Sequence, residues 1–244
     1  MSNQGTIEDV LAGRADWALE CRDGFALAGQ LADGAVDHVI GDPPYDERTH
    51  SRARSLKDGG SDIDIDFAVL PPLDTIVPSF IRSASRWIIA FCAIEQIGEY
   101  ARCAGDDWIR AGIWVRTNGT PQISGDRPAQ GAEGIAIMHG RATKKRWNQG
   151  GNRGVWNGPI SKDPRRMHPT KKPAWLMEAL IRDFTDPGEL IFDPTAGEGS
   201  TLEACVKLGR RCIGCEIDPK YHAAGVARVD RAARGLKQID LLAV

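Results

Sequence analysis

The stretch that decides the fold runs from residue 190 to residue 216 and reads LIFDPTAGEGSTLEACVKLGRRCIGCE. Its apolar start, Leu190–Phe192, predicts a buried strand, and a glycine-rich turn follows. Apolar residues then recur at helical spacing up to Gly209, and a second strand ends at Glu216. This order predicts a βαβ unit with an acid about 20 residues beyond the glycines, where an acid binds ribose hydroxyls. The dinucleotide fingerprint is incomplete, because Leu202 stands where its third glycine would be.

A second stretch, Asp42-Pro43-Pro44-Tyr45, directly follows the apolar run Val36–Gly41. The run predicts a buried strand, so the tetrapeptide stands at a strand's C-terminal end, where ligands bind in open α/β sheets. Proline lacks a backbone N–H, so the segment offers a carboxylate, carbonyl acceptors and an aromatic face. These groups suit chemistry on the exocyclic amine of a nucleobase. An acidic turn is the alternative, because Asp-Pro and Pro-Pro are common in turns.

A third segment, His168-Pro169-Thr170-Lys171-Lys172-Pro173, precedes a stretch with helical apolar spacing, Trp175–Ile181. Together the three segments resemble the β-class amino-methyltransferases of DNA, which use S-adenosylmethionine (SAM). In that family Asp-Pro-Pro-Tyr comes first and a target-recognition stretch follows. His-Pro-Thr-x-Lys-Pro and Asp-Pro-Phe-x-Gly-x-Gly-Thr come last, which is also the order here. The resemblance extends from about Glu20 to Arg228.

The resemblance implies one methyltransferase domain over residues 1–244, with a permuted motif order and a Rossmann-like α/β fold. Its sheet is expected to be mixed and mostly parallel, with helices on both faces. Asp42 and the Pro43 carbonyl would accept the two hydrogens of the target amine, and Tyr45 would stack on a base that has left the duplex. The catalytic residues implied are Asp42, Pro43, Pro44 and Tyr45.

The same resemblance implies a SAM site in which Asp23 approaches the adenine and Glu216 binds the ribose. The residues expected to bind SAM are Asp23, His168, Pro169, Thr170, Lys172, Asp193, Pro194, Thr195, Ala196, Gly197, Gly199, Ser200, Thr201, Glu216, Ile217 and Asp218. Three positions depart from the family pattern: Thr195, Glu198 and Ser200 replace the usual Phe, Ser and Thr.

The stretch from Arg141 to Lys172 is strongly basic: ten Lys or Arg and one acid give it a charge of +9, in a chain whose total is −2. Basic residues mixed with tryptophans and amides suit contacts with phosphates and base edges. A solvated basic loop is the alternative, but residues 141–167 lie where the family keeps its target-recognition region. We therefore expect a small insert that binds double-stranded DNA through Lys144, Lys145, Arg146, Trp156, Arg165 and Arg166.

Composition argues against several other classes of protein. The chain is 42% hydrophobic and 26% charged, which is ordinary for a globular protein. It lacks an apolar run long enough for a bilayer and a signal-peptide pattern, so we expect a cytoplasmic protein without a membrane partner. The six cysteines are irregularly spaced. Cys212 and Cys215 would point to opposite faces of a strand, and with no second pair we expect no metal site.

Further apolar runs predict strands at Arg86–Phe91, Ile113–Val115 and Gly134–Met138, and helices at Pro78–Ser85 and Gln96–Ala104. The polar segment Asp46–Phe67 predicts a loop beside the tetrapeptide. Glu133, directly before one of these strands, is open between a functional acid and a strand-start residue.

These observations predict methyl transfer from SAM to the N6 amine of adenine in a short DNA site. An acid at the first motif position is more typical of the adenine enzymes of the family, so Asp42 favours adenine; N4 of cytosine is the alternative. C5 methylation would need a cysteine nucleophile after a proline, and the chain has none. Methyltransferases of RNA or protein glutamine place the glycine motif first, and a non-catalytic DNA-binding protein would not need Asp42 and Tyr45. The sequence allows a homodimer, since members of the family often dimerise.

Overall fold

The structure is a computed structural model, and it describes residues 3–44, 70–119, 121–123, 125–141, 146–160 and 172–242 of the chain. In this part of the chain eight strands form one sheet, in the order β1-β8-β7-β2-β3-β5-β4-β6. The strands are β1 Trp17–Cys21, β2 Val36–Gly41, β3 Ala84–Cys92, β4 Trp108–Arg116, β5 Ala132–His139, β6 Val155–Gly158, β7 Leu190–Asp193 and β8 Arg211–Glu216. Strand β5 runs antiparallel to its neighbours β3 and β4, and the other neighbouring pairs are parallel. This arrangement confirms the predicted mixed, mostly parallel sheet.

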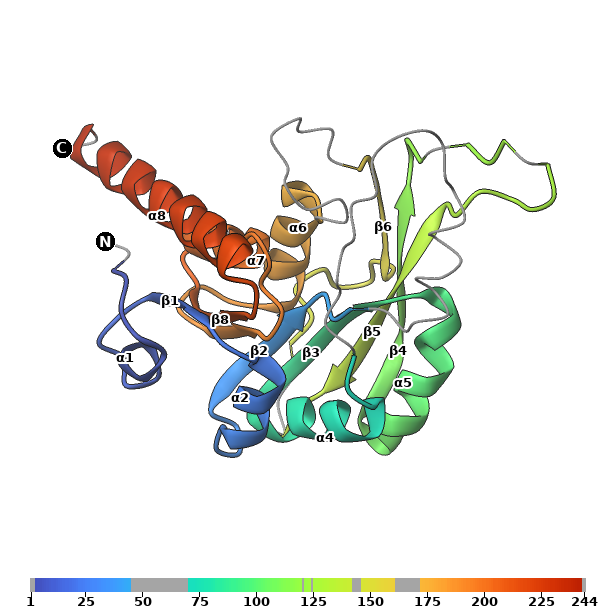
Figure 1. The fold of residues 1–244 in the computed structure, drawn as a ribbon, viewed down its shortest axis with the longest axis horizontal. Coiled ribbons are helices and arrows are strands. Elements are labelled where there is room, and N and C mark those ends of the chain that lie inside the picture. Colours follow the sequence, from blue (N-terminus) through green and yellow to red (C-terminus); the bar gives the residue numbers. More distant parts are fainter. Residues whose placement is uncertain are drawn as a thin grey trace.

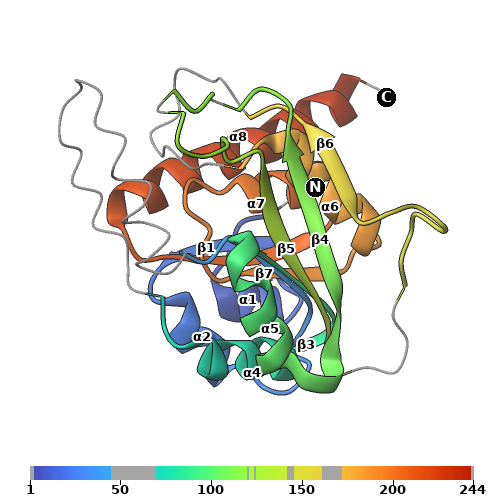
Figure 2. The ribbon, with the colours of Figure 1, turned by 90° about the vertical axis from the view of Figure 1, so that its right-hand side faces the viewer.

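Helices cover both faces of the sheet, which was also predicted (Figures 1 and 2). The helices are α1 Ile7–Leu11, α2 Gly24–Gln30, α4 Leu73–Ser83, α5 Ile97–Ala104, α6 Ala174–Phe184, α7 Ser200–Lys207 and α8 Pro219–Leu242, with short 3-10 turns at Ile94–Gln96 and Gly105–Asp107. One hydrophobic cluster joins the first face to α1, α2, α4 and α5, and a second joins the other face to α6, α7 and α8. Cys215 lies in the first cluster and Cys212 in the second, so the two thiols point to opposite faces as the strand alternation predicted.

The central strands follow directly from the apolar runs in the sequence. Val36–Gly41 and Leu190–Asp193 are almost completely buried and pair in parallel, so their C-terminal ends meet at one edge of the sheet. Helix α4 differs from its prediction, because it begins at Leu73 and contains Pro78 in its interior. Its buried face, which includes Ile76, Val77 and Phe80, offsets the backbone hydrogen bond that a proline removes. The helices of the described residues include none long and apolar enough to cross a membrane.

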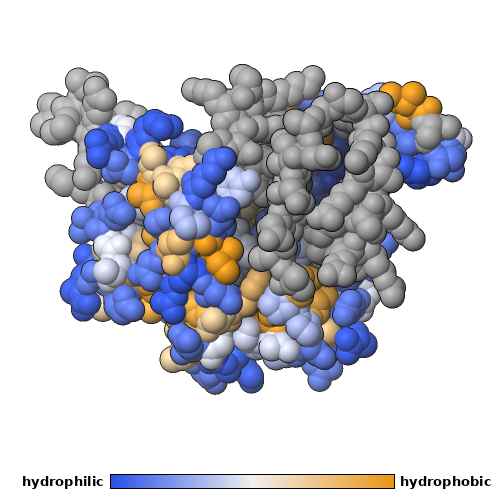
Figure 3. Space-filling model, in the orientation of Figure 1, coloured by the Kyte–Doolittle hydropathy of each residue, from blue (hydrophilic) through white to orange (hydrophobic). Residues whose placement is uncertain are grey.

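The connection between β4 and β5 leaves the sheet at the same edge as the end of β2. Gly41 pairs with Ala90 on β3, and further along β3 Cys92 pairs with Gly134 near the start of β5. The connection projects away from the sheet at the right of Figure 1 and carries a hydrophobic spot in Figure 3. Ile123, which lies in this connection, is 84% exposed.

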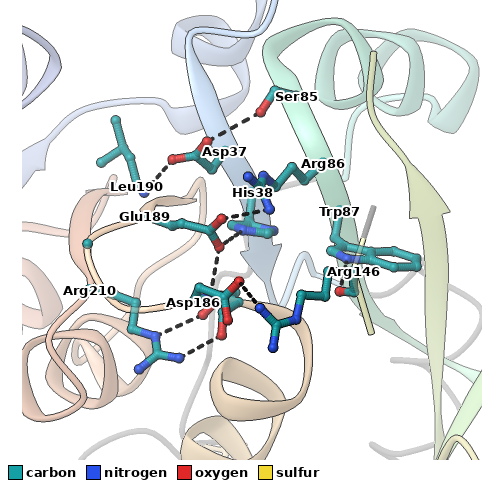
Figure 4. A network of polar contacts seen from close by, with 12 residues as sticks. Asp37, His38, Ser85, Arg86, Trp87, Arg146, Asp186, Glu189, Leu190 and Arg210 are labelled. Carbon is teal, nitrogen blue, oxygen red and sulfur yellow. Dashed lines mark hydrogen bonds and ion pairs between the residues drawn. The ribbon is translucent and has the colours of Figure 1, made fainter. Parts of the chain in front are cut away.

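A polar network links β2, β3 and β7 at the end of the sheet away from Asp42 (Figure 4). Nε2 of the buried His38 on β2 lies 2.8 Å from Oε2 of Glu189, which precedes β7. Arg86 of β3 pairs with the other carboxylate oxygen of Glu189 at 2.9 Å, and the backbone N–H of Asp186 donates to Oε2. Burial raises the pKa of Glu189, but these partners outweigh it and hold the pKa below its usual range. The network therefore holds the three strands together at the end away from Asp42.

Candidate active site

The candidate site lies where β2 and β7 end side by side. Gly41, the last residue of β2, packs so closely that a Cβ there would lie 3.0 Å from Oδ1 of Asp193 and 3.0 Å from Cδ of Pro194. A larger residue there would have to displace one of these neighbours by a few tenths of an ångström, so glycine suits the close approach of the two strand ends. The carboxylate of Asp42 follows at once, while Pro43 is buried and Pro44 is partly exposed. The first and the last of the three sequence motifs thus meet at one edge of the sheet.

The carboxylate of Asp42 is held by Lys172, which comes from the motif His168–Pro173. Nζ of Lys172 lies 2.6 Å from Oδ2 of Asp42 and 3.1 Å from Oε2 of Glu133. Arg116, on β4, forms an ion pair with Oε1 of Glu133. We call Arg116, Glu133, Lys172 and Asp42 the charge cluster. Lys172 was predicted to bind the cofactor, and in this structure its ammonium contacts the two carboxylates.

The charge cluster shifts the titration of its members. Burial raises the pKa of Asp42, and the charge of Glu133 adds to the rise, while Lys172 and Arg116 act in the opposite direction. Burial by itself lowers the pKa of Lys172, but the two carboxylates outweigh burial and raise it. Lys172 therefore stays an ammonium ion at neutral pH, and Asp42 holds a proton more readily than an exposed aspartate does.

Asp193 is the buried carboxyl of the predicted cofactor segment. It accepts a hydrogen bond from the backbone N–H of Thr195 at 3.0 Å and another from the hydroxyl of Thr201. Burial nevertheless raises the pKa of Asp193 to about 7, and the nearby charges of Asp42 and Glu216 add to the shift. The segment that follows adopts positive φ at Gly197 (+53°) and Gly199 (+74°), which favours glycine at both positions. Ala196 is buried, and Ser200 begins α7.

Glu216 organises the glycine turn from the end of the neighbouring strand. Its Oε2 accepts the backbone N–H of Gly197 at 2.8 Å, and its Oε1 accepts the N–H of Asp218 at 2.9 Å. Asp218 in turn accepts the backbone N–H of Lys220, and Ile217 between them is exposed. The acid predicted to bind ribose therefore lies beside the glycines.

Asp23 lies two residues beyond Cys21, which pairs with Glu216 where the parallel strands β1 and β8 end. Its Oδ1 caps α2 by accepting the backbone N–H groups of Phe25 and Ala26. A Cβ at Gly24 would overlap the carbonyl oxygen of Pro194, so the first turn of α2 lies directly against the predicted cofactor segment. The structure thus brings Asp23, Asp193 and Glu216 to one edge, although they come from three separate stretches of sequence.

Several predicted site residues lie outside the described residues. They are Tyr45, Lys144, Lys145, Arg165, Arg166, His168, Pro169 and Thr170. Arg146 is described: its side chain is exposed, and its guanidinium lies 3.4 Å from a carboxylate oxygen of Asp186.

Trp156 requires a correction. It was predicted to contact DNA, but it lies on β6 beside Trp114 with 7% of its surface exposed. Its indole N–H donates to Oδ2 of Asp183 at 2.8 Å, and the ring packs in the cluster that contains Phe184. An aromatic ring with this burial serves the core, so we assign Trp156 to packing. Part of the predicted recognition insert, Val155–Gly158, is an edge strand of the sheet.

Glu133 and Arg116 are site residues that the sequence did not assign. The signal for Glu133 was an acid at the head of the apolar run Gly134–Met138, where a strand-start residue was equally plausible. Strand pairing places Glu133 opposite Trp114 and close to the end of β3, which explains how it reaches Lys172. Groups of three or more metal-ligating side chains are absent from the described residues.

Comparison with known proteins gives a consistent result. A family model for DNA methylases, covering N6 and N4 enzymes, matches residues 106–227, which is half of the chain. The putative methylase YubD of Escherichia coli K12 is 44% identical over 73 residues, which are 30% of this chain and 32% of that protein. The type II methyltransferase M2.DpnII of Streptococcus pneumoniae is 25% identical over 228 residues, which cover 82% of this chain and 84% of that protein.

A solved structure has the same fold. The M1.HpyAVI–SAM complex superposes with a TM-score of 0.65 at 23% identity, covering 87% of this chain and 99% of that one. At this identity the likeness shows the fold, which is that of the predicted Rossmann-like methyltransferase.

Proposed function

Since this chain belongs to the family of N6 and N4 DNA methylases, we propose that it transfers a methyl group from SAM to the N6 amine of adenine in DNA. The observation that carries the proposal is the meeting of Asp42 with the segment Asp193–Thr201 at the ends of two neighbouring strands. A carboxylate for the amine and a glycine turn for a nucleotide-like cofactor are thereby brought to one sheet edge, where ligands bind in open α/β folds.

The residues at this edge suit SAM. A Cβ at Gly197 would meet no atom of the described residues within 4 Å, so there is open space beside the turn. The hydroxyl oxygen of Thr195 is buried and has no partner among the described residues, which leaves a polar atom for a ligand. Glu216 has oxygen lone pairs beyond the two backbone hydrogen bonds, and these suit ribose hydroxyls. When bound, SAM would supply a methyl group on a positively charged sulfur.

Asp42 and the carbonyl of Pro43 would act on the amine. The lone pair of an exocyclic amine is delocalised into the ring, which makes the nitrogen a poor nucleophile. Two acceptors for its hydrogens favour a pyramidal nitrogen and meet the positive charge that develops during the reaction. Lys172 holds the Asp42 carboxylate in place before any substrate binds, so the acceptor is preorganised. Tyr45 would stack on the extruded base.

Adenine is favoured over cytosine by Asp42, because an acid at the first motif position is more typical of the adenine enzymes that this chain resembles. N4 of cytosine is the second candidate, because the family model covers both kinds of enzyme and both amines offer two hydrogens. The basic stretch from Arg141 to Lys172 would hold double-stranded DNA by its phosphates, with the exposed Arg146 among the contacts.

A transfer assay tests the proposal. Purified protein is incubated with SAM labelled on the methyl group and with duplex DNA of mixed sequence, RNA or protein in separate reactions. We expect label in DNA, and a loss of about a hundredfold or more in Asp42→Ala with SAM affinity largely kept. Asp33→Ala, at an exposed carboxylate on another part of the surface, is the matched control and should stay active. Transfer to RNA or protein alone, or near-normal turnover by folded Asp42→Ala, would overturn the assignment.

A further inference from the structure

The charge cluster is a row of alternating charges that ends at the proposed reaction site. Arg116 of β4, Glu133 of β5, Lys172 before α6 and Asp42 after β2 follow one another through ion pairs. The Lys172 side chain is 5% exposed and the Glu133 side chain 11%, whereas that of Asp42 is 29% exposed. The Arg116 side chain, at the other end of the row, is 20% exposed. Asp42 is therefore the most exposed member, and it ends the row at the proposed reaction site.

The ammonium group of Lys172 forms ion pairs with two carboxylates. Its ammonium lies between Oδ2 of Asp42 and Oε2 of Glu133, and it also lies 4.8 Å from the centre of the Phe91 ring. A lysine paired with Asp42 alone would neutralise that carboxylate and make it a weak acceptor. Glu133 competes for the same ammonium, and Arg116 in turn competes for Glu133.

We propose that Glu133 is a positioning residue for this reaction. Its carboxylate also pairs with the ammonium of Lys172, so Lys172 neutralises Asp42 less, and Asp42 stays basic enough to take the proton that the target amine releases. The proposal rests on the proposed function, because the amine is the substrate that the site would act on.

The proton balance of this step is simple. The nitrogen–carbon bond forms as the carbon–sulfur bond of the methyl donor breaks, and the electron pair of the broken bond stays on sulfur. The nitrogen then carries a positive charge, its N–H bond breaks, and an O–H bond forms on Asp42. Asp42 is partly exposed, so it can pass this proton to water. Lys172 stays protonated throughout and takes no part in the transfer.

The other groups around Asp42 do not replace Glu133 in this role. Burial raises the pKa of the Cys92 thiol on β3 to about 12, and burial likewise raises the pKa of the Tyr100 hydroxyl on α5, so both are neutral. Asp193 on β7 is buried, and its pKa of about 7 lets it titrate near neutrality. The effect of its charge on the Asp42 titration must therefore be separated from the effect of Glu133. Arg116 and Glu133 differ in sign, and this difference supplies the test.

The test follows the titration of the Asp42 carboxyl by carbon NMR in the free protein, and the pH dependence of single-turnover methyl transfer to DNA. In Glu133→Gln we expect both the Asp42 titration and the acidic limb of the rate to move to lower pH, with a slower rate on the plateau. In Arg116→Gln we expect both to move to higher pH. The two substitutions leave Asp193 in place, so its own titration cannot produce opposite shifts.

Glu178→Gln, at a carboxylate of α6 that pairs with Arg182, is the matched control and should move neither. A purely structural role for Glu133 predicts a slower reaction or a less stable protein with the Asp42 titration unmoved, and that result would overturn the inference. If Glu133→Gln does not fold, the Arg116→Gln variant decides. An Asp42 titration that stays at the same pH or moves to lower pH in Arg116→Gln contradicts the inference. A titration that moves as expected in a protein that leaves DNA unmethylated would instead refute the proposed function alone.

Discussion

Nζ of Lys172 lies 2.6 Å from Oδ2 of Asp42, although the two residues are 130 positions apart in the sequence. This contact joins the motif that begins at Asp42 to the motif His168–Pro173, and Gly41 beside Asp193 joins the Asp42 motif to the glycine-turn segment. The three motifs are therefore parts of one site, with its acidic acceptor already fixed by an ammonium ion.

Glu216→Ala should weaken SAM binding. The variant loses the carboxylate that we place on the ribose and that also accepts the N–H groups of Gly197 and Asp218. A charge-assisted hydrogen bond contributes roughly 1.5–3 kcal/mol, so we expect a loss of that order in the calorimetric binding free energy. Glu203→Ala, at a carboxylate of α7 that pairs with Lys207 and Arg228, serves as control. Unchanged affinity in Glu216→Ala would place the cofactor elsewhere.

Asp193 should make the protein less stable as the pH rises. Its folded pKa of about 7 lies above the value of ~3.9 for an unfolded aspartate. The folded state therefore binds more protons between these values, and the free energy of unfolding falls as pH increases through this window. In Asp193→Asn this loss disappears, so the stability of the variant relative to the parent should rise by roughly 2–3 kcal/mol from pH 5 to pH 7.

Urea denaturation at several pH values, without SAM, measures this difference. Asp33→Asn at an exposed position is the control substitution. A difference between Asp193→Asn and the parent that does not change with pH would show that folded Asp193 is already ionised at pH 5.

Trp156→Ala should destabilise the fold. The ring is buried in the second hydrophobic cluster, and its indole N–H satisfies Asp183. Truncation of a buried tryptophan costs about 3–5 kcal/mol in the free energy of unfolding. Trp156→Phe should cost less but leave Asp183 without this donor, and chemical denaturation can rank the two variants. A stable Trp156→Ala protein that has lost DNA affinity would restore the original prediction of a DNA contact.

Joint replacement of Lys144, Lys145 and Arg146 by alanine should weaken DNA binding for all sequences and flatten its salt dependence. Each phosphate contact releases counterions, so loss of three should reduce the slope of log affinity against log salt by up to about 3. Fluorescence anisotropy at several salt concentrations measures the slope. Three exposed arginines in surface ion pairs elsewhere, Arg14, Arg102 and Arg234, form a control set of equal charge. An equal slope in both triple variants would mean that the patch is ordinary surface.

The sequence predicted the elements whose signals are local. Val36–Gly41 and Leu190–Asp193 are continuous apolar runs between turn residues, and both are strands in the structure. The glycine turn was also predictable, because positive φ at Gly197 and Gly199 leaves little choice of residue. Motif order then fixed which strands carry the site.

The charge cluster could not be predicted in the same way. Glu133 reaches Lys172 through the pairing of β5 with β3 and β4, and register is a property of the whole sheet. Trp156 was misjudged because β6 has four residues, too few to show alternation, and because it lies within the basic stretch from Arg141 to Lys172. A buried indole hydrogen-bonded to a carboxylate looks in sequence like an aromatic on a nucleic-acid surface.

The most direct test of the central claim is nucleoside mass spectrometry of duplex DNA treated with the purified protein and SAM. The account predicts N6-methyladenine, formed by the parent protein and absent after treatment with Asp42→Ala. N4-methylcytosine alone would correct the base and keep the chemistry at the amine. DNA that contains C5-methylcytosine, or no methylated nucleoside at all, would contradict the claim that Asp42 serves methyl transfer to an exocyclic amine.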